Sequence, residues 1–183
     1  MKSLQGHFLI ASPKLVDPNF FHTVVLIVQH NEEGAFGLVL NRPVETTVAE
    51  MWREVADEYC GVEGVLHQGG PCEGPLMVVH KEEEYSEIVV APGVYFCTRK
   101  DTIERFVADS GTQSKFFAGY AGWTAGQLEA EMEEDSWLSM PATAGAIFSD
   151  AEDLWNSLMR KAGLAKIWPG LDPARIPEDP SVN

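Results

Sequence analysis

The sequence predicts a single α+β domain built on a mixed, mostly antiparallel sheet. Two pairs of apolar stretches, 20–29 with 36–40 and 88–90 with 94–98, are joined by short turns, which is typical of β-hairpins. Stretches with helical spacing of apolar side chains interrupt these strands without the strict alternation of a doubly wound fold. A chain of 183 residues, 45% of them hydrophobic, is long enough for one substantial core and short for two. We therefore expect one domain over residues 1–170.

The N-terminal part of the chain predicts three strands. Residues 7–11 form a short apolar run. The stretch 20–29 contains five successive Val, Leu or Ile residues, so both of its faces are apolar, which indicates a central place in the sheet. After the polar turn at 30–34, residues 36–40 return as the second strand of a hairpin.

A helix is predicted from 47 to 59. Thr47 and Glu50 have the spacing of a capping box, in which the hydroxyl and the carboxylate each accept a backbone N–H of the first turn. Apolar side chains then recur at i, i+3, i+4 and i+7, which predicts one buried face. This face consists of Val48, Met51, Trp52 and Val55.

The middle of the chain predicts short strands and one further helix. Residues 65–68 and 76–79 are apolar, and the Gly- and Pro-rich stretch 69–75 between them is expected to be a loop that cannot continue a sheet ladder. After the hairpin at 88–98, residues 101–109 carry apolar side chains on one helical face behind a capping aspartate.

The stretch 115–138 predicts a strand, a glycine turn and a short helix. Phe116, Phe117 and Tyr120 supply the aromatic content of a buried strand. From about Ala125 the spacing becomes helical, and the following run of acidic residues is unfavourable at a helix C-terminus, so the helix should end near Trp137. Gly119, Gly122 and Gly126 are expected to permit backbone conformations or close approaches that a Cβ would block.

Beyond this stretch, residues 144–148 predict a short strand and 149–162 a last helix with one apolar stripe. Gly163 stands where a left-handed C-cap is expected. Residues 171–183 contain several prolines and few apolar side chains, so we expect a poorly ordered tail.

Composition restricts the class of protein. The formal charge is −15, from 28 acidic and 13 basic residues, which disfavours direct binding of nucleic acid because each neutralised phosphate needs a basic side chain. The three cysteines are odd in number and far apart, which indicates neither a disulfide framework nor a zinc site. The first residues lack the apolar run of a signal peptide, and no apolar stretch approaches the length of a membrane helix. These features predict a cytoplasmic protein.

Several motifs together resemble one bacterial family. Gly-Tyr-Ala-Gly-Trp at 119–123, with Gly-Gln-Leu-Glu at 126–129, is similar to the signature of the YqgE/AlgH family. Gly-His-Phe-Leu-Ile-Ala-Ser-Pro at 6–13, Gly-Leu-Val-Leu-Asn-Arg-Pro at 37–43 and Gly-Gly-Pro at 69–71 follow the family order, so the resemblance covers nearly the whole chain. It implies a bifurcated sheet curled toward a pseudo-barrel with three to four outer helices. It also implies an indirect role in transcriptional control of alginate production.

Residues of these motifs would form one polar pocket if the loops that carry them meet around the bend at 122–126. Arg42 could then pair with Glu129 or Glu131, either as an ion pair that locks the loops or as part of a site for a small ligand. The glycine turn could instead hold a small anion with its backbone amides, although close packing is the simpler interpretation. The predicted pocket consists of Asn41, Arg42, Gly69, Gly70, Trp123, Gln127 and Glu129.

The sequence carries no recognisable catalytic or cofactor motif. A Gly-x-Ser-x-Gly elbow is absent, and the glycine spacing matches neither a dinucleotide-binding turn nor a Walker loop. His67, Cys72 and His80 lack a standard metal-ligand spacing, so we predict no metal site and no cofactor. We expect a non-enzymatic protein that binds an unknown small molecule or protein partner. The alternative is an enzyme that acts on a small substrate through the region of Arg42 and Glu129.

Overall fold

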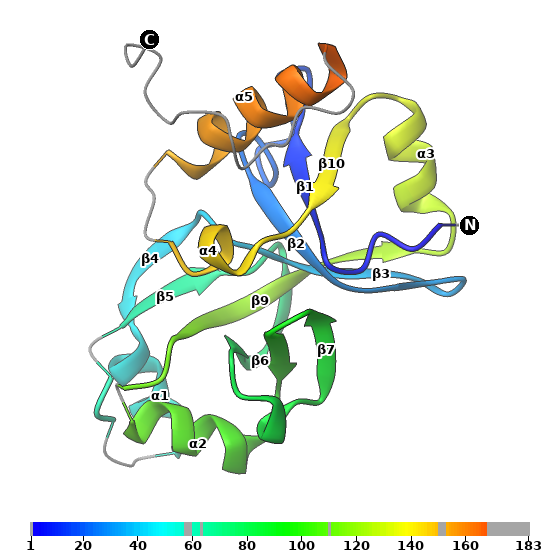
Figure 1. The fold of residues 1–183 in the computed structure, drawn as a ribbon. Helices are drawn as coiled ribbons and strands as arrows, with labels where there is room; N and C mark the ends of the chain where they lie inside the picture. Colours follow the sequence, from blue (N-terminus) through cyan, green and yellow to red (C-terminus); the bar gives the residue numbers. More distant parts are fainter. Residues whose placement is uncertain (1, 57–59, 63, 110, 150–152, 168–183) are drawn as a thin grey trace, which may run out of the picture.

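The structure is a computed structural model that describes residues 2–56, 60–62, 64–109, 111–149 and 153–167. Within these ranges, ten strands form one mixed sheet, whose main path runs β10-β1-β2-β3-β9-β6-β8-β7, with β4 and β5 branching from it (Figure 1). All strand pairs of the described residues are antiparallel except β5 with β9. The strands are β1 His7–Ala11, β2 Val24–Asn31, β3 Gly34–Val39, β4 Pro43–Thr47, β5 Val65–Gln68, β6 Cys72–His80, β7 Ile88–Ala91, β8 Val94–Cys97, β9 Ser114–Thr124 and β10 Trp137–Pro141.

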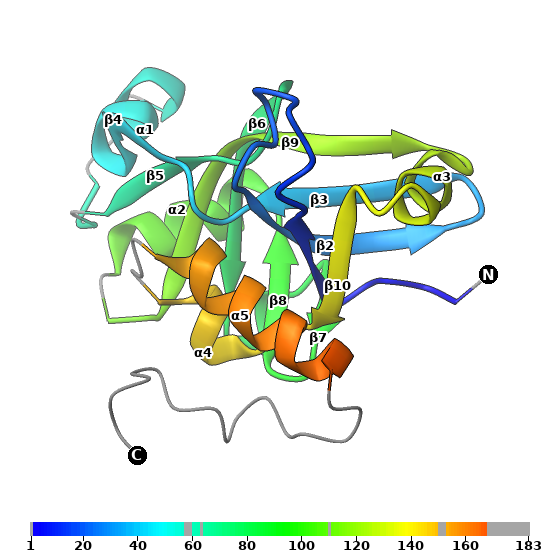
Figure 2. The ribbon, with the colours of Figure 1, turned by 90° about the horizontal axis from the view of Figure 1, so that it is seen from above.

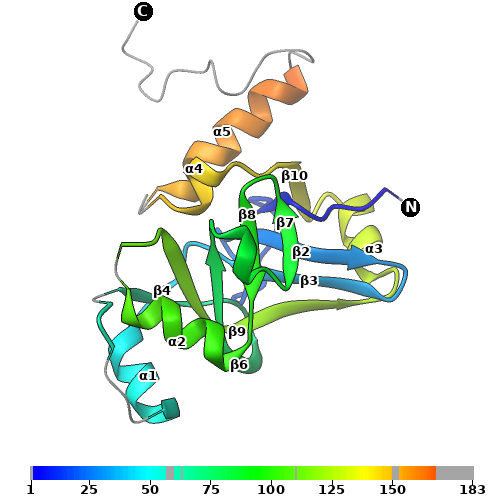
Figure 3. The ribbon, with the colours of Figure 1, turned by 60° about the horizontal axis from the view of Figure 1, so that its bottom comes forward.

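Helices pack around this sheet. Figures 1 and 3 place α1 and α2 at one end of the molecule and α5 at the other, while Figure 2 shows α3 at the far end of β2 and β3 from α1. No helix within the described ranges combines the length and the apolar character that crossing a lipid bilayer requires. The helices are α1 Val48–Ala56, α2 Lys100–Ala108, α3 Gln127–Glu133, α4 Ala144–Ile147, α5 Leu154–Ile167 and the 3₁₀ turn η1 Glu83–Tyr85.

Strand β9 is the element on which the sheet forks. One of its edges pairs with β6 along most of its length. The other edge pairs with β5 at 116–118 and with β3 at 121–124, so two different strands share it. At the fork, the Gly69 N–H donates to the Ala118 carbonyl at 2.9 Å, and the Gly69 carbonyl accepts the Val39 N–H at 2.8 Å. The bifurcated α+β fold expected from the sequence is confirmed.

Alternation along the strands separates the core into layers. Even-numbered residues of β1 and β2, such as Phe8 and Leu26, pack with Leu154 and Leu158 of α5. Odd-numbered residues of the same strands pack with Leu128 of α3. A third cluster, between the sheet and helices α1 and α2, contains the fully buried Trp52 and Phe106. Burial of each such large side chain contributes about 2–3 kcal/mol to folding.

The sheet curls so that its β7 edge approaches the segment before β1. The Gln5 side-chain amide donates to the Val89 carbonyl at 2.9 Å. Gly6 has a φ of 70°, and a Cβ there would lie 2.6 Å from the Val90 carbonyl oxygen, so glycine permits this close approach. The described strands nevertheless leave the sheet open, with β10 and β7 at the two ends of its path.

The predicted helix cap and the predicted hairpins are confirmed. The Thr47 N–H donates to Glu50 Oε2 at 2.8 Å, and the Glu50 N–H donates to Thr47 Oγ1 at 3.2 Å, which completes the capping box of α1. Strands β2 with β3 and β7 with β8 pair as expected. Residues 57–59 of the predicted helix and the predicted tail at 171–183 lie outside the described residues.

Of the three glycines in this stretch, only Gly126 lies in the turn before α3. Strand β9 continues through Gly119 and Gly122 to Thr124, and only Ala125 and Gly126 form the turn before α3. Gly119 does adopt a positive φ of 74°, and a Cβ there would lie 2.8 Å from the Cys72 carbonyl oxygen. This glycine therefore serves close strand packing, which is compatible with a continuous strand.

Other local predictions were wrong where distant partners decide the structure. Residues 144–147 form helix α4, whose N-terminus Thr143 caps, instead of a strand. Trp137 opens strand β10 against β1, and Cys72 already belongs to β6, although Gly74 and Pro75 follow it. Strand β4 was not predicted. Gly163 lies within α5, which continues to Ile167.

Candidate functional site

The bend that contains Trp123 and Gln127 is fixed by one carboxylate. Glu131 Oε2 accepts the indole N–H of Trp123 at 2.9 Å and that of Trp137 at 2.8 Å, and Oε1 accepts the Gln127 amide at 3.0 Å. The Phe20 ring packs against both indoles, with centroid distances of 6.0 Å and 5.4 Å. Trp123 and Gln127 thus belong to one hydrogen-bonded cluster around Glu131 of α3.

Glu129 pairs with a histidine. Its Oε1 lies 3.0 Å from Nε2 of His30, whose side chain is almost completely buried. The Nδ1 of His30 accepts the Leu4 N–H at 3.0 Å, so the proton of the neutral ring is on Nε2 and is donated to Glu129. This pair ties the N-terminal segment, β2 and α3 together.

Asn41 and Arg42 form a corner that holds the loop before β2. The Asn41 side chain accepts the Val24 N–H at 2.8 Å and donates to the His22 carbonyl at 2.9 Å. Arg42 Nη2 lies 2.9 Å from the Pro18 carbonyl and 3.4 Å from that of Phe21. The expected ion pair of Arg42 with an acid of the α3 region is therefore replaced by hydrogen bonds to backbone carbonyls.

Gly69 and Gly70 lie where backbones cross at the fork of the sheet. A Cβ on Gly69 would stand 2.2 Å from the Gly119 carbonyl oxygen, and one on Gly70 would stand 2.2 Å from the Tyr120 carbonyl carbon. These glycines are thus required by close packing of β5 and β6 against β9. They lie beside the Asn41-Arg42 corner, since the Gln68 N–H donates to the Arg42 carbonyl at 2.8 Å.

The seven residues predicted as one pocket consequently form two groups. Ala35 pairs with Trp123 in the β3–β9 ladder. Asn41 follows Ala35 by six residues in the chain, beyond the other end of β3. At about 3.3 Å per residue, the corner lies ~20 Å from the bend. Figures 1 and 2 show α3 and β4 at opposite ends of β3. Ligand binding by either group stays a prediction.

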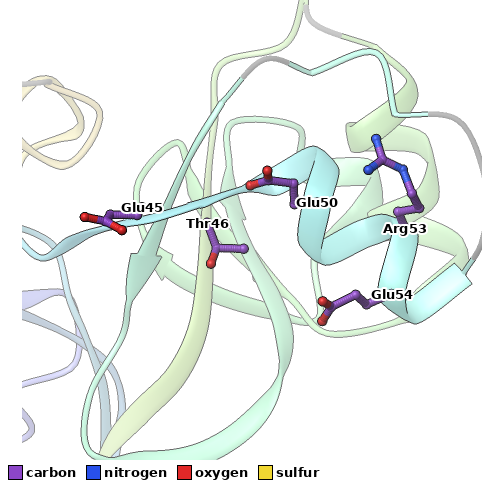
Figure 4. Close-up of a pocket in the computed structure, with 5 residues that line it drawn as sticks. All are labelled: Glu45, Thr46, Glu50, Arg53 and Glu54. Carbon is purple, nitrogen blue, oxygen red and sulfur yellow. The ribbon is translucent and has the colours of Figure 1, made fainter.

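The structure shows an open hollow on the surface of β4 and α1. Glu45, Thr46, Glu50, Arg53 and Glu54 line it. Figure 4 shows their side chains pointing in different directions, with Glu45 directed away from the helix and Arg53 and Glu54 on different sides of it. Glu50 is already engaged with Thr47 in the helix cap. The side chains do not converge on a common point, so we do not regard this hollow as a site.

A second, more enclosed cavity of about 260 Å³ is lined by polar and apolar residues together. It lies between β5, the start of β9 and the end of α4. The parallel register pairs Leu66 with Phe116 and His67 with Phe117, so Val65, His67 and Lys115 share one face of the strands. We call this space the β5–β9 cavity; its described lining consists of Val62, Gly64, Val65, His67, Ser114, Lys115, Phe116 and Phe148.

The polar side chains of the β5–β9 cavity are held by the fold. His67 and Lys115 are 9% and 8% exposed. Lys115 Nζ lies 3.4 Å from the Ile147 carbonyl and 3.3 Å from that of Ser149, at the C-terminal end of α4. Val65, in contrast, is 56% exposed although it is apolar, and it lines the same space. The cavity thus combines fixed polar groups with an uncovered apolar wall, as small-molecule sites do.

Comparison with known proteins identifies the family. A family model described as AlgH-like matches residues 8–166. The chain belongs to the AlgH-like family. It is 38% identical over 170 residues to a UPF0301 protein of Chlorobium chlorochromatii, with 88% of each chain covered. It is 39% identical over 170 residues to a UPF0301 protein of Xanthomonas axonopodis pv. citri, covering 88% of this chain and 90% of the relative.

Two solved structures share the fold. The solution structure of the AlgH protein from Pseudomonas aeruginosa matches with a TM-score of 0.75 and 32% identity, covering 91% of this chain and 96% of that one. A crystal structure from Corynebacterium diphtheriae matches with a TM-score of 0.70 and 25% identity, covering 88% of each chain. Sequence and fold thus both place the chain in the AlgH-like family. Its function has to be argued from the site.

The sequence motifs of the AlgH-like family did not point to the β5–β9 cavity. His67 was considered only as a metal ligand, and within the described residues no group of three or more His, Cys, Asp and Glu side chains could hold a metal ion. One signal was available for Lys115. Lys115 lies two residues before Phe117 in a strand, so its side chain must lie on the same face of the sheet as this buried apolar residue.

Proposed function

We propose that this AlgH-like protein binds a small ligand in the β5–β9 cavity and performs no reaction on it. The observation that carries the proposal is an enclosed space lined by the largely buried residues His67 and Lys115, whose rim residue Val65 is apolar and exposed. An exposed apolar side chain alone is ordinary, but one that borders buried polar groups gives a ligand both affinity and orientation.

The geometry favours binding over the enzymatic alternative. An enzyme that used Arg42 and Glu129 together would need both at one substrate, and they lie at opposite ends of β3. Each is also engaged, Arg42 with the Pro18 carbonyl and Glu129 with His30. The enzymatic alternative therefore has no specific observation in its favour.

The proposal places the protein in the cytoplasm, with any regulatory effect on transcription exerted indirectly through the ligand or a protein partner. The formal charge of −15 supports the indirect route, because duplex DNA repels such a chain. A mobility-shift titration with random duplex at physiological ionic strength should show no retention. Tight, salt-dependent retention would contradict the indirect route.

A fragment screen tests the binding site. Chemical shifts of backbone amides in ¹⁵N-labelled protein are recorded against a library of small aromatic and aliphatic compounds, and hits should perturb Val65, Lys115 and Phe116. Val65→Trp should block these hits, because a large side chain at the rim fills the cavity without entering the core. Val89→Trp is the matched control, since Val89 is also 56% exposed but lies on β7.

Arg42→Ala separates the two possible locations. Hits that survive Arg42→Ala and vanish in Val65→Trp support the β5–β9 cavity. Hits that vanish only in Arg42→Ala would move the site to the Asn41-Arg42 corner, and a library without any hit would refute small-ligand binding.

A further inference from the structure

Glu82 joins four segments of the chain beside a buried histidine. Its N–H donates to Nδ1 of His80, the last residue of β6, at 3.3 Å. Its carboxylate accepts the Thr112 hydroxyl at 2.7 Å and lies 3.6 Å from Nη2 of Arg105 on α2. Its carbonyl accepts the Tyr85 N–H at 3.3 Å, which closes the η1 turn. We call these contacts the Glu82 latch, which connects β6, η1, α2 and the segment before β9.

The His80 ring has no place for a second proton while the Glu82 latch is closed. Because Nδ1 accepts the Glu82 N–H, the proton of the neutral ring is on Nε2, which has no acceptor within the part of the chain that the structure describes. The side chain is 0% exposed. A proton added at Nδ1 would face the Glu82 N–H, and a buried charge with two unpaired donors is costly.

The charges around the His80 ring do not remove this cost. The negative charge of Glu82 favours a protonated ring, but the Arg105 guanidinium that pairs with Glu82 opposes it. Burial is the larger effect and lowers the pKa of His80. The phenols of Tyr85 and Tyr95 are uncharged at neutral and acidic pH. The titratable side chains in the contacts around the ring are Glu82, Tyr85, Tyr95 and Arg105.

The Glu82 latch can open without separating the strands below it. None of the three residues of η1 is buried, and the side chains of the Arg105–Glu82 pair are 50% and 30% exposed, so water replaces these contacts easily. Tyr85 is held mainly by rings and charge, with the Arg105 guanidinium 4.5 Å from its ring centroid and the Phe106 centroid 5.9 Å away. Strand β6, in contrast, is paired on both sides.

We propose that His80 and Glu82 form an acid-sensitive switch that keeps η1 closed at neutral pH and releases it on acidification. Protonation of Nδ1 takes away the acceptor of the Glu82 N–H, so Glu82 moves off the ring and its carboxylate leaves Thr112 and Arg105. Residues 82–86 then separate from α2, and the Phe106 ring is uncovered. The closed form is favoured fully above about pH 6.5, the ordinary value for a solvated histidine, and loses its advantage as the pH falls below it.

Hydrogen exchange of the full-length protein at pH 7.5 and 5.5 tests this switch. Protection factors, which correct for the intrinsic pH dependence of exchange, are measured for the amides of Glu82, Tyr85 and Ser86. An open form whose histidine titrates at about 6.5 becomes up to about tenfold more populated over this range, so protection should fall by that factor. Low urea separates local from global opening, because it should lower the protection of Leu26 in the central strand β2 and leave that of Tyr85 unchanged.

Two substitutions assign the response to the Glu82 latch. His80→Asn offers an acceptor to the Glu82 N–H and takes up no proton, so the protection of Tyr85 should become independent of pH. Glu82→Ala keeps the N–H but removes the carboxylate, so Tyr85 should lose about fivefold in protection already at pH 7.5. Glu84→Ala, at an exposed position of the same turn, is the matched control and should change neither value.

Three results would overturn the switch. These are equal protection of Tyr85 at pH 7.5 and 5.5, an equal pH response in wild type and His80→Asn, and the same urea dependence for Tyr85 and Leu26, which would leave only global unfolding. If His80→Asn does not fold, the ring ¹⁵N shifts of His80 in the wild type decide. The loss of protection must then follow the protonation of this ring, and opening without protonation would refute the proposal.

Discussion

Trp137 donates its indole N–H to Glu131 across 2.8 Å, and Trp123 donates to the same carboxylate oxygen. One acidic side chain thus satisfies two buried indoles that come from different strands, β9 and β10. Both strands are needed to cover the core face that contains Leu9 and Val25. These hydrogen bonds link α3 to the sheet. They also place two donors against one of the closely spaced acidic side chains of this helix.

Substitution of Glu131 by Ala should lower the free energy of unfolding by about 3 kcal/mol, because two buried donors lose their acceptor. Urea unfolding followed by tryptophan fluorescence measures this, and the emission should also change since both indoles report on the site. Glu134→Ala removes an acid from the exposed end of the same helix and should be neutral or slightly stabilising. Equal midpoints for the two variants would show that the indoles do not depend on Glu131.

His30 holds the N-terminal segment against the sheet, since its Nδ1 accepts the Leu4 N–H. His30→Ala should therefore raise the hydrogen-exchange rate of the Leu4 amide at least about tenfold, because an amide without its acceptor is protected only by local packing. Gln29→Ala, at the exposed neighbouring position, is the control. Unchanged protection of Leu4 in His30→Ala would mean that other contacts hold the segment.

Local signals in the sequence were sufficient where the partners are local. The Thr47 and Glu50 cap lies within one helical turn, and the β2–β3 hairpin joins neighbouring stretches. Strand β10 escaped prediction because its partner β1 is far away in the chain. Strand β4 is short and mostly exposed, so its composition carries no apolar alternation.

The predicted pocket illustrates a second limit. Motifs that recur together in a family need not share a site, since each can be required for packing on its own. Glycine is needed at position 69 because a Cβ there would clash with the Gly119 carbonyl oxygen. Asn41 is needed because its side chain accepts the Val24 N–H. Only the strand register reveals that Asn41 and Trp123 lie at different ends of β3, and register depends on long-range pairing.

The fork of the sheet should be intolerant of a methyl group at Gly69. Alanine there brings Cβ to 2.2 Å from the Gly119 carbonyl oxygen. Gly69 lies between β5 and β6, which both pair with β9, so its backbone cannot move away independently. We expect a loss of about 3 kcal/mol in the free energy of unfolding. Gly145→Ala is the matched control, because nothing lies within 4 Å of its Cβ position in α4 and alanine favours a helix by about 1 kcal/mol. A Gly69→Ala protein as stable as wild type would contradict the close approach seen at the fork.

His80 should make stability depend on pH. Its side chain is fully buried against Phe106, with ring centroids 4.4 Å apart, and among the described residues its Nε2 has no hydrogen-bond partner. Burial lowers the pKa of His80, and the negative charge of Glu82 acts in the opposite direction. The folded protein therefore resists protonation of a ring that, in the unfolded chain, titrates at its ordinary pKa of about 6.5.

The sign of the effect follows from this difference. Above about pH 6.5 the ring is neutral in both states and contributes nothing; below it, the unfolded chain binds a proton that the fold excludes, so the free energy of unfolding falls until the lower folded-state pKa is reached. The expected slope is at most about 1.4 kcal/mol per pH unit. His80→Asn keeps an acceptor for the Glu82 N–H and should flatten the stability curve between pH 7.5 and 5.5, whereas His22→Asn, at an exposed position, should not. Parallel curves for wild type and His80→Asn would show that the buried ring takes up its proton without cost to the fold.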